Sequence, residues 1–574
     1  MKRLLFYLGK YKKEAFIAPL FKLLEASFEL IVPLIIAAII DKGIVTGDKG
    51  LILKYSLVLV LLAVIGWVCA VIAQYFAAKA AVGTTAEMKS ALFKRIQTLS
   101  YSEFDTLGNS TMITRMTSDC NLVQNAVNLF LRLFLRAPII VFGAMIMAFT
   151  VSARAALVFV AVIPLLAIVV YGIMYITVPL YKKVQAKLDS LLGITRENLN
   201  GARVIRAFCR EESETERFEG TNAELSVMQR FVGKISSLTN PLTFLLINTA
   251  IIVLIYVGAL QVDHGELTQG QVIALYNYMS QILVELIKLA NLIVTVTKGI
   301  ASANRIDAVM ELETSVKFDA AALERIEKGS VKLDNVSLTY KNASAPSICG
   351  ISLSADAGET IGVIGGTGSG KTSVVNLIPR FYEATEGTVL IDGKDIREFS
   401  EEGLRDAIGV VPQHAKLFKG TIRDNMKVGN ENATDEQIIE ALKQAQAYEF
   451  VSKKEGFLDH AVENGGKNLS GGQKKRLTVA RALVRRPKIL ILDDSASALD
   501  YSTDAAMREA ISSLDYSPTT FIVSQRASSV LHADRILVLE DGEAVGYGTH
   551  SELIKSCDVY KEIYYCQFPD EKND

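Results

Sequence analysis

The chain has 574 residues, of which 50% are apolar and 21% are charged, and its formal net charge is −1. One hydrophobic core rarely serves more than about 250–300 residues, so this length predicts at least two domains. The near-zero net charge gives no general basis for a nucleic-acid partner, and six scattered cysteines without a CxxC pair predict reduced thiols rather than disulfides.

The first half of the chain carries apolar stretches of membrane-spanning length. The first fifteen residues interleave Lys and Arg with Leu and Phe, which predicts an amphipathic helix on the inner membrane surface rather than a cleavable signal. A helix needs about 20 residues to cross the hydrocarbon layer. Six segments meet this requirement: residues 15–41, 53–81, 129–151, 155–178, 242–260 and 271–297. Six such segments in one chain favour a membrane domain over buried helices of a soluble protein.

The connections between these spans predict the orientation of the chain. Two are very short, near 151–154 and 261–269, and two are long and polar, near 82–128 and 179–240. The turn at 261–269 has no Lys or Arg, whereas the amino terminus and both long connections have many. The positive-inside rule therefore predicts a multi-pass protein of the inner (plasma) membrane with both termini and both long connections in the cytoplasm. Connections this long are expected to be spans prolonged as helices.

The pattern of the sequence changes past residue 305. Short β-branched runs, such as Thr360–Ile364 and Lys488–Leu492, alternate with polar helical patterns and Gly-rich turns, which predicts a parallel α/β sheet. We therefore expect an all-α membrane domain of six helices over residues 1–305, a linker over 306–329 and an α/β domain over 330–574.

A glycine-rich loop in the α/β domain predicts a nucleotide site. It matches GxxxxGK[ST], follows an apolar strand and opens a helix expected over Thr372–Ile378. Its backbone N–H groups and the helix amino terminus hold phosphate oxygens, Lys371 reaches the β- and γ-phosphates, and Thr372 offers its hydroxyl to Mg²⁺. The expected nucleotide-binding residues of this loop are Gly365, Gly366, Thr367, Gly368, Ser369, Gly370, Lys371, Thr372 and Ser373.

An acidic residue ends a second apolar strand. Asp493 directly follows Ile489–Leu492. Ligands of parallel sheets gather at the carboxyl edge of the strands, so a carboxylate here is well placed to hold Mg²⁺ beside the glycine-rich loop. Asp493 is therefore expected to join Thr372 in the metal shell.

A third motif identifies the family. It consists of Leu469, Ser470, Gly471, Gly472 and Gln473. With this motif the second half of the chain resembles the P-loop ATP-binding cassette of ABC transporters, which implies ATP and Mg as cofactors. The resemblance implies that this signature motif contacts ATP held by a second cassette. It also implies that Tyr340 stacks on adenine, that Gln413 belongs to the Mg²⁺ and water shell, and that Asp500 lies at the cassette interface.

The first half resembles the six-helix exporter unit of the same family. Residues that match its first cytoplasmic loop are Phe104, Asp105, Gly108, Arg115 and Asp119, and those that match its second are Glu197, Gly201 and Val204–Phe208. In that family these loops carry short helices that dock onto cassettes. The resemblance implies an ATP-driven exporter, embedded in membrane lipid, that moves a small-molecule substrate and works with a second half-transporter.

Two positions depart from the family pattern. The residue after the Mg²⁺ aspartate is usually a glutamate that polarises the attacking water, and here it is Asp494. Aspartate is shorter by one C–C bond, about 1.5 Å. The family's switch histidine is replaced by Gln525, which cannot carry imidazolium charge near the γ-phosphate. Positioned acid and base groups contribute roughly 10²–10⁴-fold in rate.

This combination predicts a division of labour between two subunits. Asp494 and Gln525 predict slow hydrolysis of the chain's own ATP, while the intact signature serves the ATP of a partner. The chain thus resembles the degenerate half of heterodimeric multidrug exporters. The alternative is a homodimer whose sites tolerate both changes.

The cargo stays open. Candidate cavity residues are Arg132 and Arg136, at i, i+4 near the third span, and Glu285 and Lys288 in the sixth. Because exporter helices extend well beyond the bilayer, the favoured alternative is that these residues are cytoplasmic or structurally paired. Amphipathic drug-like compounds are the leading substrate class, and a lipid or a peptide is the runner-up. From another class, an ATP-gated channel or regulator would also suit slow hydrolysis.

Overall fold

The computed structural model describes residues 2–318 and 325–569, and the side chains from residue 6 onward. Residues 319–324 of the expected linker and 570–574 of the expected cassette lie outside this range. Contacts divide the chain into two units, Met1–Gln97 with Ser110–Glu311, and Thr98–Asn109 with Leu312–Asp574. Each unit is described by itself.

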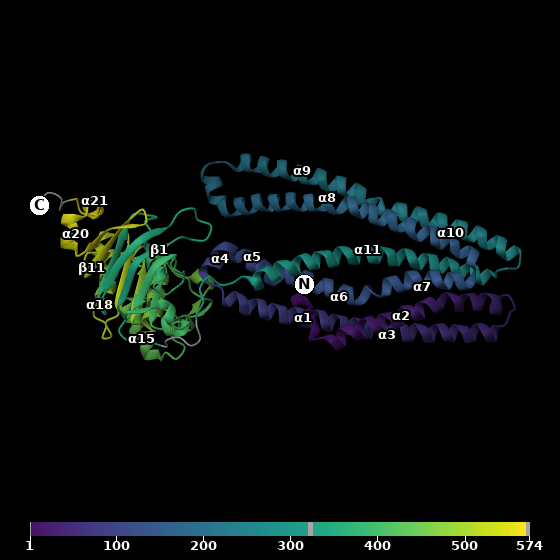
Figure 1. The fold of residues 1–574 in the computed structure, drawn as a ribbon, viewed down its shortest axis with the longest axis horizontal. Coiled ribbons are helices and arrows are strands. Elements are labelled where there is room, and N and C mark those ends of the chain that lie inside the picture. The colour runs from purple at the N-terminus through teal and green to yellow at the C-terminus, as the bar shows by residue number, and fades with distance from the viewer. Residues whose placement is uncertain (1, 319–324, 570–574) are drawn as a thin grey trace. The chain divides into compact units, whose positions relative to one another are not determined.

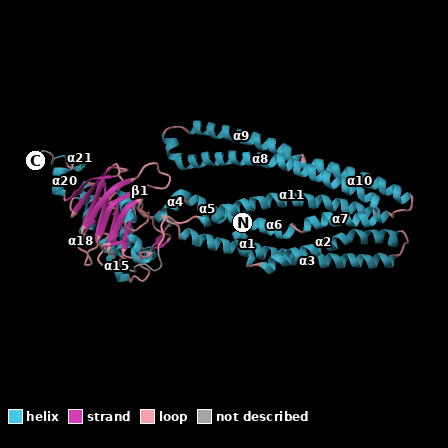
Figure 2. Ribbon diagram, viewed as in Figure 1, coloured by secondary structure: helices cyan, strands magenta, loops and turns pink. Residues whose placement is uncertain are grey.

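The first unit is built from helices (Figures 1 and 2). Among the described residues, six helical stretches are long and apolar enough to cross a membrane: Lys12–Ile44, Lys49–Gln97, Asn109–Val151, Ala153–Ala207, Glu211–Asp263 and Gln269–Glu311. The elements are α1 (Lys2–Gly9), α2 (Lys12–Ala38), the π-helical η1 (Ile39–Ile44), α3 (Lys49–Gln97), α5 (Asn109–Thr114), the π-helical η2 (Arg115–Asp119), α6 (Cys120–Leu133), α7 (Arg136–Val151), α8 (Ala153–Ala207), α9 (Glu211–Ser237), α10 (Thr239–Asp263) and α11 (Gln269–Glu311). The six predicted spans are thus confirmed.

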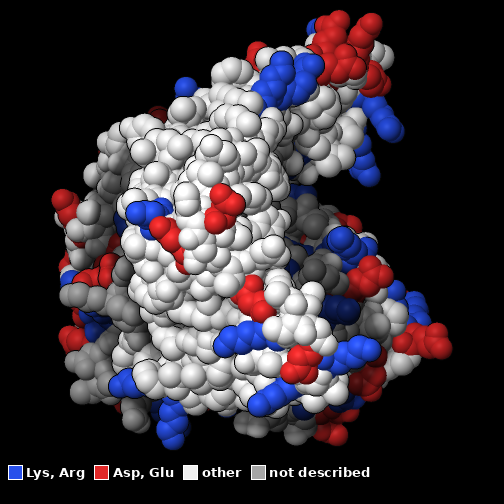
Figure 3. Space-filling view, turned by 90° about the vertical axis from the view of Figure 1, so that its right-hand side faces the viewer, with Lys and Arg blue, Asp and Glu red and all other residues white. Residues whose placement is uncertain are grey.

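Small residues bring these helices together. Helix α2 packs on α3, and fully buried alanines such as Ala26, Ala73 and Ala77 lie on the two helices. Without a hydrophobic force between helices in lipid, close approach of small side chains supplies the packing. Large apolar side chains such as Trp67 are exposed instead, as expected where lipid is the solvent. The face of the molecule in Figure 3 accordingly carries broad areas without Lys, Arg, Asp or Glu.

Both long polar connections contain prolonged helices, as predicted. Helix α3 continues to Gln97, and α8 and α9 extend through residues 179–237 with a break only at 208–210. The third span differs from the expectation, because α6 ends at Leu133 and α7 begins at Arg136. Pro138 lacks the N–H that would bond to the carbonyl of residue 134, and its ring crowds that carbonyl. Arg132 and Arg136 therefore lie on either side of a break in the helical hydrogen bonding, within the helical stretch Asn109–Val151.

The second unit contains a six-stranded sheet, in the order β12-β11-β3-β10-β9-β6. Its strands are β3 (Thr360–Gly365), β6 (Ile408–Val411), β9 (Ile489–Asp493), β10 (Thr519–Ser524), β11 (Arg535–Glu540) and β12 (Glu543–Gly548). All adjacent pairs are parallel except β11 with β12. Every residue of β9 and β10 is buried, which explains the continuous apolar run Ile489–Leu492 of β9. The predicted parallel α/β sheet is confirmed.

Successive side chains of β9 enter two different cores. Ile489 and Ile491 pack with one cluster, and Leu490 and Leu492 pack with the other. This alternation follows from the two-residue period of a strand. Strand β9 begins and ends one residue later than the apolar run that predicted it, so Asp493 is its last residue.

A four-stranded antiparallel sheet and a short hairpin complete the strands. They are β1 (Val331–Leu338), β2 (Ile348–Ala355), β4 (Glu386–Ile391), β5 (Lys394–Asp395), β7 (Gly420–Thr421) and β8 (Ala461–Val462). The helices of this unit are α4 (Tyr101–Leu107), α12 (Lys371–Leu377), α13 (Glu401–Arg405), α14 (Ile422–Lys427), α15 (Asp435–Gln444), α16 (Tyr448–Ser452), α17 (Gly471–Leu483), α18 (Tyr501–Ser512), α19 (Ala527–Val530), α20 (His550–Ser556) and α21 (Asp558–Gln567). Short 3-10 turns η3 (Ile396–Glu398), η4 (Phe457–Asp459) and η5 (Asn464–Gly466) lie between them.

Asp392 anchors the segment that enters β1. Its two carboxylate oxygens accept hydrogen bonds from the backbone N–H groups of residues 327–330, at 2.8–3.0 Å. Burial opposes ionisation of this carboxyl group, but these four N–H donors hold its pKa below the ordinary value. One side chain therefore fixes the backbone where the described part of the cassette begins again.

We expect Asp392→Ala to speed amide hydrogen exchange across residues 327–330 by about tenfold or more, because a hydrogen bond to a charged group contributes roughly 1.5–3 kcal/mol. Exchange measured by mass spectrometry on the intact chain tests this. Asp395→Ala is the matched control, since Asp395 pairs with Arg397 instead. Unchanged exchange in Asp392→Ala would contradict the anchoring role.

Candidate nucleotide-binding site

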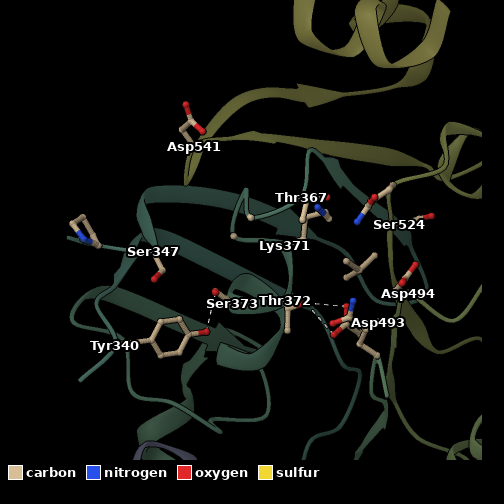
Figure 4. Close-up of a pocket in the computed structure, with 16 residues that line it drawn as sticks. Tyr340, Ser347, Thr367, Lys371, Thr372, Ser373, Asp493, Asp494, Ser524 and Asp541 are labelled. Carbon is tan, nitrogen blue, oxygen red and sulfur yellow. Dashed lines mark hydrogen bonds between the residues drawn. The ribbon is translucent and has the colours of Figure 1, made fainter. Parts of the chain in front are cut away.

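Four neighbouring parallel strands end at one edge of the six-stranded sheet. The glycine-rich loop follows β3, Gln525 follows β10, Asp494 follows β9, and Gln413 lies two residues beyond β6. These segments line a cavity of about 600 Å³ (Figure 4). The predicted site residues in its lining are Tyr340, Thr367, Gly368, Gly370, Lys371, Thr372, Ser373, Gln413, Asp493, Asp494 and Gln525.

The glycine-rich loop turns through left-handed backbone. Gly368 has φ of 85° and Gly370 has φ of 94°, values that side chains with a Cβ rarely adopt. Lys371 opens α12, and its Nζ donates to the carbonyls of Gly365 at 3.0 Å and Gly366 at 2.5 Å. Burial lowers the pKa of this ammonium, against the charges of the two aspartates at the site. A loop closed around one lysine is a cradle that can bind phosphate oxygens.

Thr372 and Asp493 meet across the cavity. The Thr372 hydroxyl donates to both carboxylate oxygens of Asp493, at 3.1 Å each (Figure 4). Asp493 is 5% exposed, and burial raises the pKa of its carboxyl group although the Thr372 hydroxyl opposes this. Magnesium in nucleotide sites takes one or two carboxylates together with phosphate oxygens. The hydroxyl and the carboxylate are hard oxygen donors, so this pair fits Mg²⁺.

Tyr340 stands at the other side of the cavity. Its hydroxyl lies 2.9 Å from the Ser373 hydroxyl, and its ring makes an edge contact with Tyr382, with centroids 5.0 Å apart. Tyr382 in turn donates to Asp105 of α4 at 2.6 Å. Tyr101 of α4 stacks on Phe381 with centroids 4.5 Å apart. Sequence reasoning missed Tyr382, because nothing in its local pattern distinguishes it from an ordinary surface tyrosine.

The two off-pattern positions lie in the cavity lining. Asp494 has φ of 48°, and its N–H donates to the carbonyl of Val523 at 3.0 Å. Gln525 is exposed. Its backbone carbonyl accepts from the Gln567 amide at 2.8 Å, and the Gln567 side chain also accepts from the N–H of Ala527 at 2.8 Å. The loop that carries Gln525 is thus held from α21, a contact that the sequence did not predict.

The signature motif is not part of this cavity lining among the described residues. Ser470 caps α17, and its side chain exchanges hydrogen bonds with Gln473. Ser470 and Gly471 are exposed, and Leu469 is buried beneath them. Asp500 is exposed as well, and its carboxylate accepts from the N–H of Thr503 at 3.0 Å as the cap of α18. The signature and Asp500 therefore lie on the surface of the cassette.

Three of the four candidate cavity residues of the membrane unit are ion-paired. Arg136 is 8% exposed, and it donates to Glu285 at 2.6 Å and to Glu29 at 2.7 Å. Lys288 donates to the same Glu285 oxygen at 2.8 Å. A second tie joins Arg305 to Asp119. Of the four candidate cavity residues, Arg136, Glu285 and Lys288 thus form one ion-paired group, as in the structural alternative, although Arg136 Nε and Glu285 Oε2 are buried without a hydrogen-bond partner among the described residues.

Comparison with protein families gives two matches in this chain. Residues 15–286 match the ABC transporter transmembrane region, and residues 348–497 match the ABC transporter model. The second match begins in β2, contains the glycine-rich loop and the signature, and ends just after Asp494.

Several relatives are similar over nearly their whole length. The chain is 36% identical to the ABC transporter ATP-binding protein YfiB of Bacillus subtilis, over 568 residues that cover 99% of each. It is 32% identical to YgaD of the same organism, named for multidrug export, with 99% of each covered. It is also 32% identical to the ATP-dependent lipid A-core flippase of Syntrophus aciditrophicus, over 85% of this chain and 81% of the flippase.

The fold has a close counterpart among solved structures. A bacterial Atm1-family ABC exporter with ATP bound superposes with a TM-score of 0.82, at 23% identity, over 97% of this chain and 98% of that one. The six spans, the parallel sheet and the glycine-rich loop agree with these matches. The chain belongs to the ABC transporter family, as a half-transporter in which a transmembrane region is fused to an ATP-binding cassette.

Proposed function

We propose that this chain is one half of a heterodimeric, ATP-driven exporter of amphipathic, drug-like compounds. In this proposal its own ATP site is slow and its signature completes the competent site of the partner. The observation that carries the proposal is the pairing of Asp494 and Gln525 in the cavity lining with an intact signature exposed on the surface. The similarity to YgaD, named for multidrug export, supports the substrate class.

Binding of ATP in this proposal uses groups that are already in place. The Lys371 ammonium and the loop N–H groups hold the phosphates, and Tyr340 offers a ring face to adenine. Thr372 and Asp493 would hold Mg²⁺, with Gln413 completing its shell. When bound there, Mg²⁺ would neutralise part of the phosphate charge.

Catalysis is the weak step at this site. Asp494 places its carboxylate about 1.5 Å short of the reach of a glutamate. Gln525 can hydrogen-bond to a phosphate oxygen but adds no positive charge. Since positioned acid and base groups contribute roughly 10²–10⁴-fold in rate, we infer that this site binds ATP and turns it over slowly.

The signature side is suited to an external ligand. A Cβ placed on Gly471 would have Ala498 Cβ, at 3.8 Å, as its nearest neighbour in this chain, so internal packing does not require glycine there. Glycine is expected where backbone must approach a ligand or another chain closely. The helix amino terminus below it adds N–H groups and partial positive charge, which suits the γ-phosphate of ATP on a partner cassette.

Transport follows from coupling both cassettes to the membrane units. ATP draws the cassettes together, the cytoplasmic helices carry this movement, and the cavity turns outward, as alternating access requires. Helix α4 is the coupling element of the first cytoplasmic loop, since Asp105 and Tyr101 contact the cassette side chains Tyr382 and Phe381. Both termini and both long connections lie in the cytoplasm in this proposal.

A lipid is the second candidate substrate, because the lipid A-core flippase is a relative at 32% identity. Transport assays with both substrate classes in the same vesicles separate the two. Movement of a fluorescent lipid without movement of any amphipathic dye would favour the flippase function.

The isolated chain is expected to bind ATP and to hydrolyse it slowly, because both sites of a homodimer would carry Asp494 and Gln525. Co-expression with the partner half-transporter should raise steady-state ATPase activity by about 10² or more. Lys371→Ala is the binding control and should abolish nucleotide binding by the isolated chain. Robust turnover by the isolated chain would overturn the heterodimer assignment.

In the heterodimer, Asp494→Ala should cost little ATPase activity, because it alters a site that is already slow. Ser470→Ala should cost about 10²–10³ in rate, the typical loss for one donor of a preorganised phosphoryl-transfer site. Steady-state ATPase and vesicle transport with wild-type partner measure both. Equal damage from the two variants would show that this chain's own site hydrolyses.

Cysteines at positions 105 and 382 should be cross-linked by a short bifunctional thiol reagent in native membranes, in a chain whose six native cysteines are replaced by serine, because the side chains at these positions meet at their tips. The control pair places cysteines at 106 and 382, one residue along α4, and should cross-link much less. An impermeant thiol reagent added outside intact cells should leave the cysteine at 105 unlabelled. Labelling from outside would reverse the proposed orientation.

A further inference from the structure

A buried lysine connects three segments of the cassette. Lys475 lies in the second turn of α17, and only 2% of its surface is exposed. Its Nζ donates to the backbone carbonyls of Gln413 at 2.8 Å, Pro412 at 3.1 Å and Asp493 at 3.4 Å. The three donors of one ammonium thus meet three carbonyls, from the loop after β6 and from the end of β9.

The cost of this arrangement indicates a specific role. A buried charge is unfavourable unless it is well solvated by fixed polar groups. Burial lowers the pKa of the Lys475 ammonium, while the charges of Asp494 and Asp493 act in the opposite direction. The hydrogen-bond acceptors are carbonyl oxygens, so the lysine holds backbone and leaves the Asp493 carboxylate available to Thr372.

Because Lys475 belongs to α17, its hydrogen bonds to the three carbonyls also hold this helix in place. The helix begins at Gly471, and Ser470 is its cap. At about 1.5 Å per residue, Lys475 lies only about 6–8 Å along the helix from the exposed signature. Helix α17 is also held by the next residue, Arg476, which donates to the carbonyl of Gln446 at 2.7 Å. A shift of the backbone at Gln413 or Asp493 would therefore move the signature with it.

We propose that Lys475 is a positioning residue that serves two ATP sites at once. It fixes the backbone of Gln413 and Asp493, which shape the metal shell of this chain's own site. Through α17 it also fixes Ser470 and Gly471, which complete the site of the partner. The second half of this inference rests on the proposed heterodimer, whereas the first half does not.

The test uses the full chain assembled with its partner. Lys475→Met keeps the length of the side chain and removes its three donors, and Lys475→Gln keeps an amide donor. Lys474→Met is the matched control on the neighbouring, partly exposed position. Thermal unfolding and co-purification with the partner establish that each variant is folded and assembled; if Lys475→Met is not, the comparison is made with Lys475→Gln.

Two readouts separate positioning from general stability. The first is the Mn²⁺ concentration for half-maximal metal binding with ATP, followed by electron paramagnetic resonance, with a partner whose phosphate-loop lysine is replaced by alanine. The second is steady-state ATPase activity with the wild-type partner. Lys475→Met should weaken metal binding about 10–100-fold, as loss of an outer-shell contact typically does, and lower ATPase activity about tenfold or more. Lys475→Gln should restore part of both.

A folded Lys475→Met heterodimer that matches the wild type in either readout would overturn the proposal of a residue shared by two sites. A different result would contradict the heterodimer assignment. If Ser470→Ala leaves ATPase activity intact, the signature does not serve the partner, yet the Mn²⁺ readout still measures what Lys475 does for its own site.

Discussion

The cassette depends on one constraint, the side-by-side parallel order of β3, β10, β9 and β6. Residue pairs such as Ser524 with Ile364, and Val523 with Asp493, fix the register across the middle of this group. Parallel strands end at a common edge, so the segments that follow them meet whatever their separation in sequence. The hydrogen bond between Thr372 and Asp493 joins residues 121 positions apart for this reason. The glycine-rich loop after β3 and Asp493 at the end of β9 therefore cannot be separated without breaking the buried hydrogen bonds between these strands.

This constraint fixes backbone positions, while the chemistry at each position depends on side-chain length and charge. The groups expected to bind the nucleotide have both the backbone position and the side chain that binding needs. Lys371 contacts the backbone of the glycine-rich loop, and the Thr372 hydroxyl contacts the Asp493 carboxylate. Asp494 directly follows β9 and lines the cavity, but it has one methylene fewer than a glutamate at that position would have. The backbone arrangement of a cassette can therefore be retained, with its glycine-rich loop and its signature surface, while the length of the side chain after Asp493 changes.

The local sequence pattern was enough to predict the elements that have a regular hydrophobic pattern or a fixed sequence motif. The six spans were predicted from the length of their apolar segments. The glycine-rich loop was predicted from the motif GxxxxGK[ST] between an apolar strand and a helix. Contacts between distant segments carried no such pattern. Lys475 sits in a basic run, Lys474–Arg476, that looks like a solvated face, and its burial depends on where β6 and β9 end. The break before α7 could have been predicted from the sequence, because Pro138 marks it.

The ion pairs of the membrane unit constrain how α11 can move. Arg136 ties Glu285 of α11 to Glu29 of α2, and Asp119 of η2 ties Arg305 farther along the same helix. Removing one partner from a buried pair typically costs about 3–5 kcal/mol, because it leaves a charge unpaired. Sliding α11 past its neighbours would break both ties at once, whereas moving it together with them would break neither. Movement transmitted along α11 is therefore expected to carry α2, α6 and α7 as one body rather than to displace α11 alone.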